Sequence, residues 1–262
     1  MKEQIVATLP KDHPWADGIF WFDVIGSTNT EAKRMAQEGA PQGTVLIADR
    51  QTGGRGRMGR SFSSPGGQGI YMSVILRPSC AATELMHLTC AAGVTMCNAV
   101  EQVSGFRPQI KWINDLIAKG KKLGGILTEL SLIPGTDQVD FCVVGIGINC
   151  LQNRLDFPPE IRDIAISLKT ATQRSVDRAR LAAAMVEALQ SMSEQLLSGK
   201  ASFMEQYAAD CCTLGQDIYL LRGEKRLPCR ALRLDPDGAL VVEYPDGSVE
   251  AVSSGEVSVR PR

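Results

Sequence analysis

The spacing of hydrophobic and polar positions divides the chain into a long α/β part and a shorter all-β part. In the long part, apolar runs of strand length alternate with segments whose apolar residues recur every three or four positions, as on one face of a helix. The predicted strands span residues 19–25, 44–48, 70–76, 109–113, 116–118, 123–132 and 139–148. The predicted helices span residues 84–103, 178–198 and 201–212, and a further helix opens within residues 26–31. This alternation predicts a sheet covered by helices.

The pattern changes after residue 212, where the helical spacing ends and short alternating segments begin. Turn sequences rich in glycine, proline and aspartate separate these segments, as in a small antiparallel β unit. The predicted strands are residues 217–221, 227–234, 239–244, 248–252 and 256–260. Five strands in this short stretch predict an SH3-like barrel, so we expect two domains, residues 1–212 and 213–262.

The helix that opens within residues 26–31 has a polar start, Ser27-Thr28-Asn29. Thr28 and Glu31 have the spacing of a capping box, and Gly39 marks the end of the helix. Helix N-termini also present free N–H groups to anionic ligands. The three polar residues therefore either cap the helix only or also face a ligand, and the local pattern leaves both open.

The chain contains eight cysteines, but they are scattered and none form a C-x-x-C pair. Cys90 and Cys97 lie seven positions apart on the predicted helix at residues 84–103, the spacing of one packed face. We expect buried thiols and no disulfide framework. His13 and His87 are the two histidines, so we expect no transition metal held by the protein.

A net charge of −1 and an isoelectric point near 6.2 exclude a generally basic, nucleic-acid-binding surface. The apolar runs fall short of the ~18 residues that a membrane span needs. The N-terminus lacks the apolar core of a signal peptide. We therefore expect a cytoplasmic protein.

Glycine and arginine alternate from Gln51 to Arg60, in the sequence Gln-Thr-Gly-Gly-Arg-Gly-Arg-Met-Gly-Arg. Glycines let the backbone approach a ligand closely, and the arginines bring several guanidinium groups into one small volume. This loop therefore predicts a site for a phosphorylated ligand.

Two other interpretations of the loop are weaker. Gly54-x-Gly56-x-x-Gly59 matches the dinucleotide-binding fingerprint, but that fingerprint must open a helix and needs an acidic residue about 20 positions on. A loop-like stretch follows instead, and the next acidic residue is Glu84. A disordered basic loop is also disfavoured, because the stretch lies between two predicted strands.

Two further stretches point to a ligand site. Gly145 and Gly147 alternate inside an apolar strand, so that either a flat ligand or another backbone lies against it, or the strand has a β-bulge there. Lys122 ends a hairpin turn beside Gly124 and Gly125, where missing side chains leave room. A hairpin lysine is usually solvated, so the local pattern alone does not assign it a function.

Taken in order, these stretches resemble the biotin–protein ligase family. The loop from Gln51 to Arg60 resembles the family's biotin- and adenylate-binding loop. Lys111-Trp-Ile-Asn-Asp-Leu116 resembles its K-W-P-N-D-L segment, and Lys122-Leu-Gly-Gly-Ile-Leu127 its K-L-A-G-I-L segment. Ser27-Thr28-Asn29 and Gly145-Ile-Gly-Ile-Asn149 complete the set. The resemblance implies a mixed-sheet, biotin/lipoate ligase-like catalytic domain before the barrel.

The resemblance also implies a reaction and a set of site residues. Biotin's carboxylate attacks the α-phosphate of ATP to give biotinyl-AMP, and a carrier lysine then attacks the anhydride. Arg/Lys side chains and Mg²⁺ carried with the nucleotide stabilise the charge. The implied catalytic residues are Lys122, Arg57 and Asp115. The implied biotin-binding residues are Ser27, Thr28, Asn29, Gln51, Gly54, Arg55, Arg57, Lys122, Gly124 and Gly125, and the nucleotide-binding residues are Arg55, Arg57, Arg60, Phe62, Lys111, Asn114 and Asn149.

Asp115 has two interpretations. Its carboxylate either hydrogen-bonds the incoming amine of the acceptor lysine and accepts its proton, or it only stabilises an Asx turn at Asn114-Asp115. Two positions depart from the family's pattern: Ile113 replaces the usual proline, and Phe62 stands where tryptophan is common.

The implied acceptor is a biotin carboxyl carrier protein or domain of acetyl-CoA carboxylase or a related carboxylase. The residues before the first predicted strand leave no room for a helix-turn-helix, so we expect no DNA partner; a homodimer is left open. The competing functions are a lipoate–protein ligase or octanoyltransferase, and a non-catalytic biotin sensor.

Overall fold

The computed structural model describes residues 1–222, 225–253 and 258–261. Its helices are α1 (Lys2–Thr8), α2 (Thr28–Gln37), α3 (Leu88–Ser104), α4 (Leu168–Thr172), α5 (Arg178–Gln195) and α6 (Lys200–Asp210). The strands of the first sheet are β1 (Ile19–Ile25), β2 (Val45–Gln51), β3 (Gly69–Leu76), β4 (Gln109–Lys111), β5 (Asp115–Ala118), β6 (Lys121–Leu132) and β7 (Val139–Asn149). The second sheet consists of β8 (Asp217–Arg222), β9 (Lys225–Leu234), β10 (Leu240–Glu243), β11 (Val249–Val252) and β12 (Ser258–Pro261).

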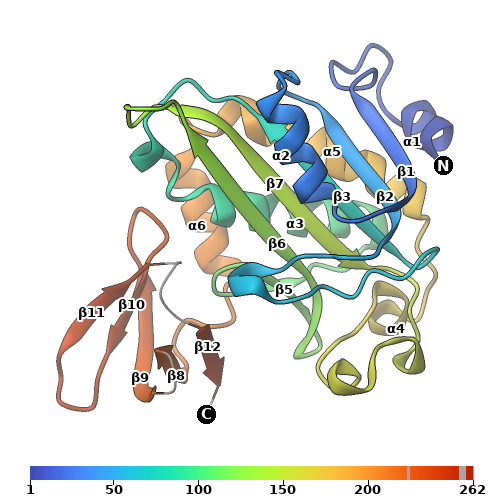
Figure 1. Ribbon diagram of the computed structural model, residues 1–262. Helices are drawn as coiled ribbons and strands as arrows, with labels where there is room; N and C mark the ends of the chain where they lie inside the picture. Colours follow the sequence, from blue (N-terminus) through green and yellow to red (C-terminus); the bar gives the residue numbers. More distant parts are fainter. Residues whose placement is uncertain (223–224, 254–257, 262) are drawn as a thin grey trace.

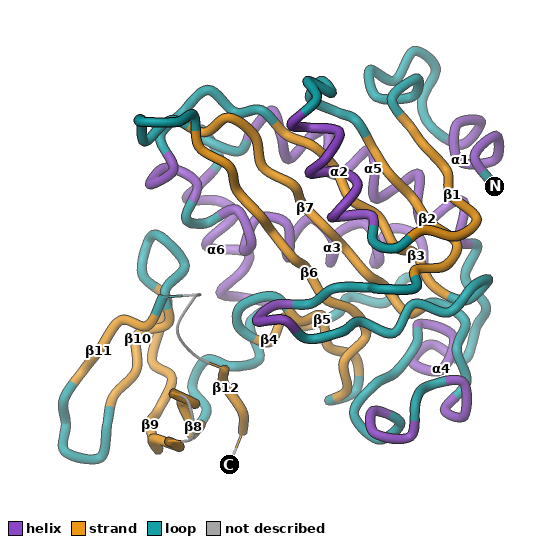
Figure 2. The backbone as a smooth tube through the Cα atoms, viewed as in Figure 1, coloured by secondary structure: helices purple, strands orange, loops and turns teal. Residues whose placement is uncertain are grey.

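The first sheet has the strand order β1-β2-β3-β7-β6-β5-β4. Strands β1 and β2 run parallel, and every other neighbouring pair is antiparallel, so the expected mixed sheet is confirmed. The parallel pair is joined through α2, as parallel neighbours require a crossover connection. Figures 1 and 2 show α2 in front of the sheet and α3 and α5 behind it.

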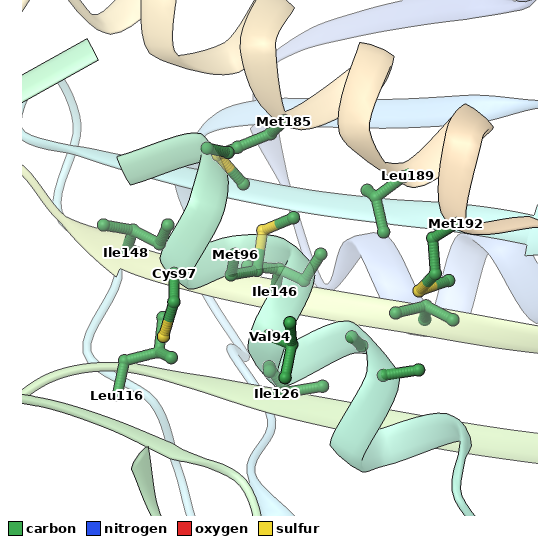
Figure 3. Close-up of a cluster of buried hydrophobic side chains, with 14 of the residues drawn as sticks. Val94, Met96, Cys97, Leu116, Ile126, Ile146, Ile148, Met185, Leu189 and Met192 are labelled. Carbon is green, nitrogen blue, oxygen red and sulfur yellow. The ribbon is translucent and has the colours of Figure 1, made fainter. Parts of the chain in front are cut away.

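The larger core fills the space between the sheet and helices α3 and α5 (Figure 3). Methionine and cysteine side chains of these helices pack there against branched residues of the strands; the labelled members include Met96, Cys97, Met185, Met192, Ile126, Ile146 and Ile148. The adaptable methionines fill the gaps between the layers. Burial raises the pKa of Cys90 and of Cys97, and all eight cysteines are free, so the expectation of buried, unpaired thiols is confirmed with Cys212 only partly buried.

A smaller core lies on the opposite face, where α2 covers part of the sheet. Ala32 and Ala36 of this helix pack against Phe141 and Val143 of β7. Side chains alternate between the two faces of a strand, so Gly145, two residues further along β7, lies on this same face. Beyond the N-terminus of α2 the sheet therefore has glycines where larger side chains would otherwise stand.

The second sheet is antiparallel, with the order β11-β10-β9-β8-β12. Strands β8 to β11 form a four-strand meander, and a fifth strand, β12, returns to pair with β8. This is the strand order of an SH3-like barrel. The Trp112 indole donates a 2.9 Å hydrogen bond to the carbonyl of Gly238, which ties this unit to the first sheet. The boundary at residue 213 stays a prediction.

The long predicted elements are confirmed to within a few residues, and the differences lie at their ends. The helix predicted at residues 84–103 is a 3₁₀ turn, Ala82–Leu85, followed by α3. The prediction missed α1 and α4, which are short. Part of the strand predicted at residues 256–260 lies outside the described residues, and β12 covers the rest.

Candidate functional site

A cavity of about 790 Å³ opens on the same face of the sheet as α2, in the part that the helix does not cover. The glycine–arginine loop crosses in front of the strands here, as Figure 1 shows. The cavity brings together most of the residues predicted for the site: Ser27, Thr28, Asn29, Gln51, Arg55, Arg57, Arg60, Phe62, Lys111, Asn114, Asp115, Lys122, Gly125 and Asn149. Gly54 and Gly124 are not among the lining residues.

Gly145 and Gly147 form the floor of the cavity, and side chains lie directly against both. A Cβ at Gly145 would stand 1.7 Å from the amide oxygen of Asn29, and one at Gly147 would stand 2.5 Å from the ring of Phe62. Pairing with β3 and β6 is continuous through both glycines, so the bulge interpretation is wrong. The flat group that the glycines admit is, in this structure, a pair of side chains.

Gly54 and Gly124 have a similar packing role outside the cavity. A Cβ at Gly54 would lie 2.4 Å from the carbonyl oxygen of Phe62, and one at Gly124 would lie 2.4 Å from that of Gly147. Neither position tolerates a side chain without a shift of the backbone. Their predicted contact with biotin stays a prediction.

The N-terminus of α2 points its polar residues at the cavity. The side-chain oxygen of Gln51 accepts hydrogen bonds from the backbone N–H of Thr28 at 2.8 Å and from its hydroxyl at 3.1 Å. The predicted capping box at Thr28 and Glu31 is wrong: Ser27 is the N-cap, its side chain makes no capping hydrogen bond, and Glu31 pairs with Arg34. Gln51 takes the place of the cap and joins the loop to α2.

The loop is a hairpin that folds back over the glycine floor. Phe62 N–H donates to the carbonyl of Gly54 at 2.9 Å, and Gly56 N–H donates to that of Arg60 at 2.7 Å. Between these arms Met58 has a φ of 56°, a left-handed conformation at the tip. The Phe62 ring packs edge-on against Tyr71, with centroids 6.3 Å apart. This hydrogen bonding accounts for an ordered loop, against the disordered alternative.

The cationic side chains of the site have different partners. Arg57 Nη1 donates to the Asn114 side-chain oxygen at 3.3 Å, and burial lowers the pKa of Arg57, which still carries its charge at neutral pH. Lys122 Nζ lies 2.6 Å from the Asp115 carboxylate. Arg55 Nη1 lies 3.2 Å from the Glu129 carboxylate. Arg57 and Lys122 are therefore held by two consecutive residues, Asn114 and Asp115.

Asp115 does not form the turn that one interpretation gave it. The turn comprises residues 112–114, and Asp115 begins β5, where it pairs with Lys111 and with Gly125. The Asx-turn interpretation is therefore wrong. The peptide bond between Trp112 and Ile113, the position of the family's usual proline, is cis.

Asn149 lies at the opposite end of the cavity, and its amide is held by the chain around it. Its Nδ2 donates to the carbonyl of Ile166 at 3.2 Å, and its Oδ1 accepts from Gln152 at 3.3 Å. The apolar side chains of Phe157, Ile161 and Ile164 line the cavity as well.

The prediction missed the polar lining residues Ser61, Ser63 and Gln109. It also missed three polar residues that support the site from outside the lining. Ser73 interrupts the apolar run of β3, and this buried hydroxyl in a strand was the one available signal. Its oxygen lies 2.8 Å from that of Thr28 and 2.6 Å from the side-chain oxygen of Asn29. Ser64 accepts a 3.0 Å bond from the Gln51 amide. Glu129, the third, has partners in distant segments that no local pattern reveals.

Within the described ranges, the structure has no group of three or more histidine, cysteine, aspartate or glutamate side chains that could hold a metal ion. Asp115 is the one carboxylate among the described lining residues. A divalent ion bound here would therefore depend on the ligand's own oxygens. Across the part of the chain that the structure describes, no helix is both long and apolar enough to cross a bilayer.

We predict that Gly145→Ala lowers the free energy of unfolding by about 1–3 kcal/mol, the range for overpacking a filled site. The added methyl displaces the Asn29 amide from its contacts with Ser73 and Leu127. Urea unfolding measures the change. Gly26→Ala is the control, because a Cβ there meets nothing within 4 Å. Equal stability of the two variants would contradict the packing argument.

Comparison with known proteins agrees with this geometry. Residues 21–149 match the Biotin/lipoate A/B protein ligase family, and residues 213–260 match the Biotin protein ligase C terminal domain. The chain is 34% identical over 242 residues to the bifunctional ligase/repressor BirA of Bacillus spizizenii, which covers 92% of this chain and 74% of that protein. It is 31% identical over 238 residues to the biotin–[acetyl-CoA-carboxylase] ligase of Mycobacterium tuberculosis, with 88% and 85% covered.

A solved structure is similar over almost its whole length. The biotin protein ligase from Aquifex aeolicus, in complex with biotin and ATP, superposes with a TM-score of 0.77 at 30% identity and covers 93% of this chain and 99% of that one. Both sheets thus have counterparts in a known ligase. The chain belongs to the biotin protein ligase family.

Proposed function

We propose that this protein activates biotin with ATP as biotinyl-5′-AMP and transfers the biotin to a lysine of a carrier protein or domain of acetyl-CoA carboxylase or a related carboxylase. One observation carries the proposal. A single cavity is lined both by the hydrogen-bonded pair Thr28 and Gln51 and by the cations Arg57 and Lys122, which are held by Asn114 and Asp115. A polar, uncharged ring and a polyphosphate call for these two kinds of wall.

The biotin end is proposed at the N-terminus of α2. Ser27, Thr28 and Gln51 line the cavity there, and together they offer two hydroxyls and a side-chain amide. A ureido group, with two N–H donors and one carbonyl acceptor, matches such a set. The match of residues 213–260 to a biotin protein ligase domain also favours biotin over lipoate.

The nucleotide end is proposed between the loop and Asn149. The apolar side chains of Phe157, Ile161 and Ile164 offer an apolar surface for a base, and Asn149 lines the same cavity. Arg60 and Lys111 line the same cavity and would neutralise the phosphates. We propose that Mg²⁺ arrives with the nucleotide, with the Asp115 carboxylate as the protein group of matching chemistry.

The two chemical steps place different demands on the residues. In the first, a biotin carboxylate oxygen bonds to the α-phosphorus and pyrophosphate leaves. Arg57 and Lys122 would stabilise the charge that gathers on the phosphoryl oxygens. In the second, the carrier lysine nitrogen bonds to the biotin carbonyl and AMP leaves. Asp115, 2.6 Å from Lys122, would accept the proton that this amine loses.

Two further features of the chain bear on where and with what it acts. We propose a cytoplasmic location, which the eight free thiols support because a reducing compartment keeps thiols unpaired. The carrier domain would approach the open side of the cavity, where Arg55 and Arg60 lie.

The direct test supplies the protein with MgATP and either biotin or lipoate, and identifies the acyl-adenylate by mass spectrometry. We expect biotinyl-AMP and pyrophosphate with biotin, and no adenylate with lipoate. Formation of lipoyl-AMP alone would assign the chain to the lipoate branch of its family. Absence of both would remove the activity.

We predict that Lys122→Ala lowers the rate of biotinyl-AMP formation by ~10² or more, the scale of one preorganised electrostatic contact. The substitution removes a cation from the cavity wall and leaves Asp115 unpaired. Single-turnover formation of the adenylate measures it, with thermal unfolding as a check of the fold. An unchanged adenylate yield would remove Lys122 from the mechanism.

We predict that Arg57→Gly still forms adenylate but releases it, so that biotin appears on bystander lysines. The Arg57 guanidinium bridges the loop to Asn114 at 3.3 Å, and its loss opens the cover of the cavity. The assay adds an unrelated lysine-rich protein beside the carrier and compares its biotinylation by variant and parent. If the bystander stays equally unlabelled, Arg57 does not retain the intermediate.

A further inference from the structure

Glu129 lies on β6 at a point where three separate segments meet. Its carboxylate receives Asn29 Nδ2 at 3.1 Å, Lys33 Nζ at 3.1 Å and Arg55 Nη1 at 3.2 Å. Asn29 and Lys33 belong to α2, and Arg55 belongs to the glycine–arginine loop. The side chain of Glu129 is 17% exposed, so its charge is largely removed from water.

This burial is balanced by the donors. Desolvation by itself raises the pKa of Glu129, but the hydrogen bonds from Asn29 and Lys33, together with the charges of Arg55 and Lys33, outweigh it and hold the pKa below the usual value. The carboxylate is therefore ionised at neutral pH. An ionised, partly buried acceptor fixes its donors more strongly than a neutral one does.

The orientation of Asn29 depends on this acceptor. Its Nδ2 points to Glu129 and to the carbonyl of Leu127, at 3.2 Å, so its Oδ1 must point the other way, to Ser73. Because Oδ1 only accepts, the Ser73 hydroxyl donates to it. Thr28 then has its own hydroxyl proton free for Ser73 or Gln51. The direction of this hydrogen-bond chain along the cavity wall is thus set from Glu129.

Arg55 extends the same control to the loop. Its backbone forms a β-bridge with Ser61 across the hairpin. Its guanidinium pairs with Glu129, which lies outside the cavity lining. The loop arm that carries Gln51 is therefore tied to α2 twice, through Gln51 itself and through Glu129.

We propose that Glu129 is a positioning residue that sets the hydrogen-bonding directions of the biotin-binding wall and fixes the loop to it. The inference rests on the proposed biotin-ligase function. Glu129 touches no reacting atom and lies outside the cavity lining; it acts through Asn29 and Arg55. Its loss weakens the binding of biotin in ground and transition states equally, so it raises KM for biotin and leaves kcat nearly unchanged.

The test measures adenylate formation by Glu129→Gln at varied biotin and saturating MgATP. We expect KM for biotin to rise roughly tenfold, the effect of losing charge from one shared acceptor. We expect kcat to stay within about twofold. Asp140→Asn is the matched control, because Asp140 lies on β7 of the same sheet and also pairs with an arginine, 3.1 Å from Arg77, but both residues lie outside the cavity lining.

A double-mutant cycle identifies the route. If Glu129 acts through Arg55, the combined Glu129→Gln and Arg55→Met variant raises KM by less than the product of the two single changes. An unchanged KM in Glu129→Gln, an equal rise in Asp140→Asn, or strictly multiplicative effects in the cycle would each overturn the proposal. Failure of the parent protein to form biotinyl-AMP would instead refute the proposed function.

Discussion

An excess of positive charge around one cavity is the constraint on which the rest of the site depends. Five cationic side chains line it, Arg55, Arg57, Arg60, Lys111 and Lys122, against the single carboxylate of Asp115 among the described residues. Like charges in a partly enclosed volume repel, and the repulsion grows as water is excluded. The fold offsets part of it from outside the lining, through Glu129. An anionic ligand would supply the remaining negative charge.

The glycine floor explains why so much chemistry fits on one face of the sheet. β7 continues from the packed face beneath α2 into the cavity without a change of register. Only the side chains differ: Phe141 and Val143 pack under the helix, and Gly145 and Gly147 replace them where the cavity begins. The sheet therefore remains rigid while its surface drops by the depth of a side chain.

The sequence predicted the strands well because a buried strand needs an apolar run, and such runs are visible locally. It failed where a contact joins distant positions. The capping box predicted for Thr28 and Glu31 is replaced by hydrogen bonds from Thr28 to Gln51, 23 positions away, while Glu31 pairs with Arg34. Glu129 meets residues 74 to 100 positions away, which no periodicity encodes. The loop residues were predicted together because the residue types themselves indicate a function: glycine allows close approach of the backbone to a ligand, and arginine binds anions.

The seam between the two sheets also passes through the site. Trp112 lines the cavity, and its indole N–H donates a hydrogen bond to the carbonyl of Gly238, in the turn between β9 and β10 of the second sheet. The other two tryptophans stand elsewhere: Trp15 is buried near the N-terminus, and Trp21 is on the edge strand β1, bonded to Asp23. Indole emission responds to nearby charge and polarity, so the fluorescence of Trp112 is a built-in optical reporter on which cavity filling and movement of the second sheet both register.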